Sequence, residues 1–79
     1  MKMIRCQCTN TFGEYVGSNK TYDIYINPVS VASVYQCSMT RVVRDAPDVD
    51  GWLIELTTGT KHFTTVFPEA LVAENICQQ

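Results

Sequence analysis

The sequence predicts a small α+β domain, mainly β, in which four or five antiparallel strands form a twisted sheet or half-barrel with one short C-terminal helix. Three observations favour this fold class. Apolar and polar residues alternate in several short runs, which is the period of half-buried strands. A Thr58-Gly59 pair separates two such runs and indicates a hairpin. A short helical pattern follows Pro68. With 79 residues, the chain is expected to form one domain over 1–79.

The first predicted strand is Met3 to Cys8, a run of six residues near the start of the chain. Its period of two places Ile4 and Cys6 on the same face as Cys8. The polar stretch Thr9 to Lys20 follows and contains two glycines. We expect this stretch to be a loop or a wide hairpin connection.

The second predicted strand is Thr21 to Ile26, and it places Tyr25 on the face opposite to its two isoleucines. Asn27 and Pro28 end the strand, because proline cannot donate a hydrogen bond to a strand ladder. Asparagine is a typical helix cap and proline suits the first helical position. One short helical turn is therefore expected over Pro28 to Val31.

The third predicted strand is long, from Ala32 to Val43. A turn-rich acidic loop, Asp45 to Gly51, connects it to the hairpin. The C-terminal helix is predicted to begin with Pro68 and Glu69, because proline suits the first helical position and an acidic residue complements the helix dipole. Leu71 lies on the apolar face of this helix, which is short and must dock on the sheet to be stable.

The hairpin spans Trp52 to Phe67, and the sequence leaves its register open. A two-residue loop would place Glu55 opposite His62. A three-residue loop with a bulge at Gly59 would place Glu55 opposite Lys61. Both are common hairpin geometries, and both pair the glutamate with a side chain that can carry positive charge.

Charge and hydropathy exclude several classes of protein. Six lysines and arginines are nearly balanced by eight aspartates and glutamates, which argues against direct binding to nucleic acid. No segment approaches the ~20 apolar residues of a membrane span, and the first residues do not resemble a secretory signal. We therefore expect a cytoplasmic protein with reduced thiols that act as small buried apolar groups. These are the thiols of Cys6, Cys8, Cys37 and Cys77.

The cysteines and the single histidine also suggest two chemical alternatives. Zinc or a small ligand could be bound by Cys6 and Cys8 together with Cys37 and either His62 or Cys77. The Cys-x-Cys spacing on a strand differs from that of a zinc knuckle, so buried thiols are favoured and no cofactor or metal is expected. A catalytic set of Cys8, His62 and Glu55 lacks a nucleophile elbow, so no enzymatic activity is expected.

A group of turn and core residues resembles small proteins of the FlbD type, which are found in flagellar operons, and short phage and prophage proteins. The resemblance covers roughly Tyr22 to Ile76 and implies a small non-enzymatic β protein. The N-terminal strand, the long third strand and the acidic loop depart from the pattern. The matching residues are Ile26, Asn27, Pro28, Val31, Val34, Ile54, Leu56, Gly59, Glu69, Leu71 and Ile76.

These observations predict a small protein-binding module, and the resemblance suggests a phage accessory protein. In one specific form it would inhibit a host defence complex by occluding its surface, as anti-CRISPR proteins do. The alternative is a homo-oligomeric structural or regulatory protein, for instance a homodimer that associates through its edge strands. Aromatic and acidic side chains are expected to bind the partner. They are Tyr25, Asp45, Asp48, Asp50 and Trp52.

Overall fold

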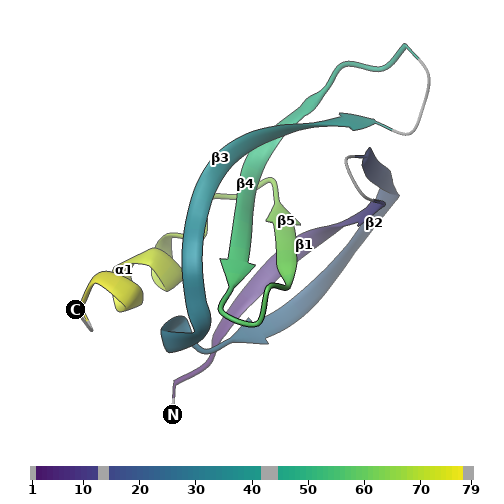
Figure 1. Cartoon of the computed structure of the whole chain (residues 1–79). Coiled ribbons are helices and arrows are strands. Elements are labelled where there is room, and N and C mark those ends of the chain that lie inside the picture. The colour runs from purple at the N-terminus through teal and green to yellow at the C-terminus, as the bar shows by residue number, and fades with distance from the viewer. Residues whose placement is uncertain (1, 13–14, 42–44, 78–79) are drawn as a thin grey trace.

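The protein, represented by a computed structural model, is described over residues 2–12, 15–41 and 45–77. These residues form five strands, one turn of 3-10 helix and one α-helix (Figure 1). The predicted class, mainly β with a short C-terminal helix, is confirmed. In chain order the elements are β1 (Ile4–Phe12), β2 (Tyr15–Ile26), η1 (Pro28–Ser30), β3 (Val31–Arg41), β4 (Val49–Leu56), β5 (Lys61–Thr64) and α1 (Glu69–Cys77).

The sheet closes into a barrel with the strand order β1-β2-β3-β4-β5. Long antiparallel ladders join β1 to β2 and β3 to β4. The contacts that close the barrel are short. β1 meets β5 at Thr9 and Phe63, and β2 meets β3 in a parallel arrangement at Tyr15 with Thr40 and at Val16 with Arg41. The fold thus goes one step beyond the predicted half-barrel, because two short contacts complete the ring.

The prediction of a loop or a wide hairpin connection over Thr9 to Lys20 is wrong for most of these residues, which are strand residues. β1 continues to Phe12 and β2 begins at Tyr15, so most of this polar stretch belongs to a hairpin. The main chains of the two strands pair through Thr9 with Thr21 and Thr11 with Val16, with a register shift between these pairs. Polar residues are compatible with these strands because main-chain groups make the ladder, while side chains such as that of Lys20 face solvent.

The acidic loop is also shorter than predicted. β4 begins at Val49, so Asp50 and Gly51 are strand residues that pair with Ser38 and Cys37 of β3. The Ser38 hydroxyl donates a hydrogen bond to Asp50 Oδ1, which gives the aspartate a partner within the ladder. β3 itself begins at Val31, one residue before the predicted start, and the predicted end of the third strand at Val43 lies outside the described residues.

The hairpin adopts the second of the two predicted registers. Glu55 pairs with Lys61, and Leu56 N–H donates to the Thr60 carbonyl at 2.8 Å, which leaves a three-residue loop. Gly59 has a φ of 91°, the left-handed conformation that glycine adopts without a steric cost. The Lys61 ammonium lies 3.7 Å from the Glu55 carboxylate. Both groups are partly solvated, so the ion pair contributes ~0.2–1 kcal/mol.

The predicted turn after β2 is confirmed. Asn27 caps η1, because its side-chain oxygen accepts a hydrogen bond from Val29 N–H at 3.2 Å. Pro28 occupies the first position of the turn and is buried. The predicted start of the C-terminal helix also holds, since Val72 N–H donates to the Pro68 carbonyl. α1 lies beside η1 at one end of the barrel (Figure 1).

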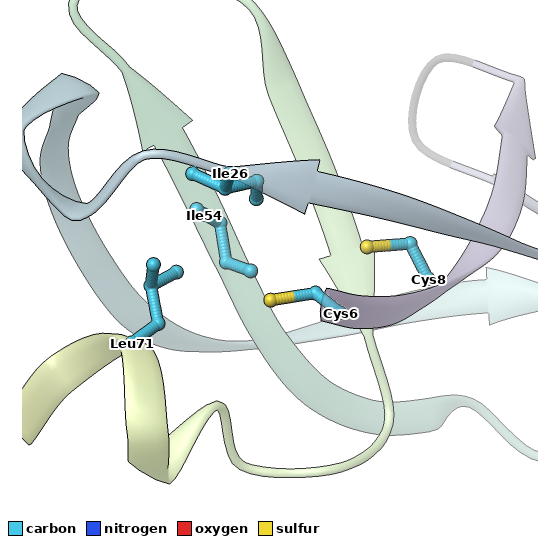
Figure 2. Packing of buried hydrophobic residues seen from close by; sticks show 5 residues of the cluster. All are labelled: Cys6, Cys8, Ile26, Ile54 and Leu71. Carbon is cyan, nitrogen blue, oxygen red and sulfur yellow. The ribbon is translucent and has the colours of Figure 1, made fainter. Parts of the chain in front are cut away.

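Two apolar clusters stabilise the barrel from opposite faces of β4. Ile54 belongs to the cluster nearer α1, which Figure 2 shows with Cys6, Cys8, Ile26 and Leu71 directed toward one another. The adjacent Leu53 points the other way and packs with Val16 and Phe63. β4 is therefore buried on both sides, and the continuous apolar run Trp52 to Ile54 is explained by this double burial.

Candidate interaction surface

The five residues predicted to bind a partner do not form one cluster. Tyr25 projects from β2 with 64% of its surface exposed, at the end of the strand that leads into η1. Asp45 and Asp48 are exposed in the loop before β4, and Asp50 is exposed within β4. Because Asp50 pairs with Ser38, the acidic residues lie near the other end of β3. The tyrosine is as exposed as expected, but it lies far along the barrel from the aspartates.

Trp52, the fifth predicted residue, lies in the middle of β4 and is half-buried. Its ring contacts the ring of Phe67 edge to face, with centroids 5.5 Å apart and planes at 70°. Such aromatic pairs prefer this geometry and contribute about 0.5–1.5 kcal/mol beyond the area that they bury. The tryptophan therefore belongs to a different surface from Tyr25, one that includes the segment between β5 and α1.

That segment carries two adjacent exposed apolar side chains that the sequence analysis missed. Val66 is 65% exposed and the neighbouring Phe67 is 45% exposed, although both are apolar. We call Trp52, Val66 and Phe67 the apolar surface. The sequence contains a signal for this surface. Val66 and Phe67 stand immediately before a proline that starts a helix, so the pair does not belong to a strand face that could bury it.

Two grooves lie on either side of Phe67. The larger, with a volume of about 390 Å³, runs between the first half of β1 and the segment from Thr64 to Leu71. The smaller, about 290 Å³, lies between α1 and the start of β3. Phe67 and Leu71 line both grooves. Exposed apolar side chains beside an open groove are typical of surfaces that bind another molecule.

The thiols of Cys6 and Cys8 are buried in the cluster around Ile54, as the sequence predicts. Cys37 is half-buried and packs against the other cluster, and the side chain of Cys77 lies outside the described part of the chain. The residues considered for zinc are thus divided between two faces of the barrel. Within the described residues, no three side chains of His, Cys, Asp or Glu come together in a metal-binding arrangement.

The residues considered for catalysis do not form one hydrogen-bonded set. His62 Nδ1 lies 3.0 Å from the Tyr22 hydroxyl, and the two rings meet edge to face. Glu55 lies beside Lys61 instead. Burial, and to a smaller extent the nearby Cys6 and Asp23, raise the pKa of Cys8 to about 11, so this thiol is protonated at neutral pH. A protonated, fully buried thiol is a poor nucleophile.

The His62–Tyr22 pair predicts a pH dependence of stability. Burial lowers the pKa of His62 below its ordinary value of 6.5, so the folded state binds fewer protons than the unfolded state. This contribution to stability is complete above pH ~6.5 and is lost as the pH falls through the folded pKa. We expect the urea midpoint to decrease from pH ~7 to ~5.5, and to decrease less in His62→Gln. If the urea midpoint decreased equally with pH in the wild-type protein and in His62→Gln, the pH dependence would not come from His62.

The chain was also compared with known proteins. No protein-family model, no curated protein and no solved structure matches it. The resemblance to FlbD-type and short phage proteins therefore remains a prediction. In the part of the chain that the structure describes, no helix has the length and apolarity needed to cross a bilayer.

Proposed function

We propose that this chain is a non-enzymatic protein-binding module that uses the apolar surface of Trp52, Val66 and Phe67. The observation that carries the proposal is the exposure of two adjacent apolar side chains, Val66 and Phe67, beside an open groove. Exposing them to water is unfavourable by ~25 cal/mol for each Å² of apolar area, and a partner that covers them recovers this free energy. Aromatic side chains are also enriched where proteins meet.

The more specific proposal is a phage accessory protein that inhibits a host defence complex by occluding its surface. It derives from the resemblance to short phage and prophage proteins. Occlusion needs shape and a few strongly binding side chains, and it needs no catalytic group. Reduced buried thiols are compatible with a partner in the cytoplasm. In the alternative proposal, the same apolar surface joins copies of this chain into a homo-oligomer.

A pull-down with a matched pair of variants tests the binding surface. We expect wild-type protein to retain one stoichiometric partner from a lysate of the source organism, and the double variant Val66→Ser/Phe67→Ser to lose it at least tenfold. The control is Tyr25→Ser/Val29→Ser, which removes an aromatic residue and a valine that are at least as exposed as Phe67 and Val66. This control should retain the partner. Mass spectrometry identifies and quantifies the retained protein.

Each other outcome has a distinct meaning. If only the Tyr25/Val29 variant loses the partner, binding occurs at the tyrosine that the sequence predicted, and the apolar surface is not the site. If Asp45→Asn/Asp48→Asn alone loses it, the acidic loop is the site. If wild-type protein retains nothing and sediments as an oligomer that Val66→Ser/Phe67→Ser dissociates, the homo-oligomer is correct.

A further inference from the structure

The first half of β1 has a strand partner on one side only. β2 pairs with it throughout, while β5 reaches it at Thr9 and ends at Thr64. The Thr64 hydroxyl then donates to the Gln7 carbonyl at 2.8 Å, which shows that the main-chain groups of Gln7 face away from β2. Because these groups alternate along a strand, those of Arg5 face the same way. Within the described residues, no strand pairs with β1 at this position.

The open edge forms one wall of the 390 Å³ groove. Ile4 to Gln7 line this wall, and Val66 and Phe67 lie on the opposite one. Cys6 and Leu71 point from β1 and α1 into the apolar cluster below (Figure 2). The groove therefore offers main-chain hydrogen-bonding groups along its side and apolar atoms at its base. An extended polypeptide presents the same two features, spaced two residues apart.

We propose that this groove accepts an extended segment of a partner protein as an additional strand beside β1. The inference rests on the proposed function and specifies the form of the partner. The segment takes the place into which β5 would continue, so it runs antiparallel to β1. Peptides that add a strand to a sheet edge gain affinity from main-chain hydrogen bonds and specificity from alternate side chains.

Charge defines the side chain that the segment places opposite Arg5. The Arg5 guanidinium lies 2.9 Å from Asp23 of β2 and is 65% exposed, on the outer face of the sheet. A strand on the other side of β1 would place one side chain next to this guanidinium, and opposite charges are favoured in such cross-strand positions. We therefore expect an acidic residue there, flanked by two apolar residues that point toward Cys6 and Leu71.

A folded second copy fits the groove less well than an extended segment does. Its own β1 is flanked by β2 on one side and faces the Val66–Phe67 wall on the other. If two copies approached each other through these edges, their Val66–Phe67 walls would meet before the two β1 strands could pair. A single unpaired strand has no such wall, so it reaches the main-chain groups of Arg5 and the N–H of Gln7, whose carbonyl already accepts from Thr64.

Titration of the full, ¹⁵N-labelled chain with capped pentapeptides tests this inference. The probe is Thr-Val-Glu-Val-Thr, and its charge control is Thr-Val-Lys-Val-Thr. We expect the glutamate peptide to shift the amide signals of Arg5 and Gln7 at submillimolar concentration and the lysine peptide to bind at least fivefold more weakly. Methylation of the peptide nitrogen at glutamate should abolish binding, because it removes the donor to the Arg5 carbonyl.

A matched pair of variants separates charge recognition from general effects. Arg5→Gln should make the two peptides bind equally, whereas Lys20→Gln, which removes an exposed cation from β2, should keep the fivefold preference. The inference is overturned if neither peptide shifts the Arg5 and Gln7 amides at 5 mM, or if the N-methylated peptide binds equally well. It is also overturned if these amides shift with protein concentration alone, because a second copy then occupies the groove. In each of these cases, loss of the partner protein from the Val66→Ser/Phe67→Ser variant in the pull-down would still support the proposed function.

Discussion

Gly51→Ala is expected to destabilise the fold by about 3 kcal/mol, the upper range for overpacking a filled core. A methyl group at this position of β4 would lie 2.6 Å from Cζ of Phe63 and still closer to the main-chain oxygen of Thr64. The phenyl ring is fully buried, and the oxygen belongs to the β4–β5 ladder, so neither can move without loss of packing or pairing. A chain of this length has a total stability of ~4–12 kcal/mol, so the variant loses roughly between a quarter and three quarters of it.

Urea unfolding followed by circular dichroism measures this effect. The matched control is Gly59→Ala in the hairpin loop, where an added methyl group meets nothing within 4 Å. The only destabilisation expected in that variant comes from placing alanine at a positive φ of 91°, which costs about 1–2 kcal/mol. A Gly51→Ala protein that unfolds at the wild-type urea concentration would show that β4 and β5 are not packed this closely.

Phe63→Ala is expected to cost about 3–5 kcal/mol, as for large-to-small substitutions of a buried aromatic residue. Phe63 has no exposed surface, packs with Val16 and Leu53, and pairs with Thr9 across the contact between β5 and β1. Its loss leaves a cavity at the point where the barrel closes. Thermal or urea unfolding provides the measurement.

The control for Phe63→Ala is an aromatic residue in a strand that is not buried. Tyr25→Ala removes a ring that is 64% exposed, and it should change stability by about 1 kcal/mol or less. If the two substitutions were equally destabilising, the assignment of Phe63 to a buried cluster would be wrong.

Much of the fold was predictable because local chemistry determines it. Asn27 and Pro28 can form few structures other than a capped turn, and Gly59 narrowed the hairpin to two registers. The polar half of the first hairpin was missed because its strands are held by main-chain pairing, and hydrophobic periodicity reports only side-chain burial. The start of β4 was missed for a related reason, since aspartate and glycine usually indicate turns and here are strand residues.

The candidate surface was less predictable than the fold. The exposure of Tyr25 follows from strand parity, which is a local property. The distance between Tyr25 and the aspartates depends instead on which strands become neighbours and on the direction in which the barrel closes. The same holds for the groove, because it joins β1 to a segment near the other end of the chain, and no short-range pattern contains that contact.

The short contacts that close the barrel have a consequence for the order of folding. The β1–β2 hairpin and the β3–β4–β5 meander each form from residues that are near in sequence, whereas the bond from Thr64 to Gln7 spans 57 residues. Closing so long a loop costs chain entropy before the new contacts offset it. We therefore expect the two halves of the chain to form early on the folding pathway, and their union to be the late, slow step that sets the overall rate.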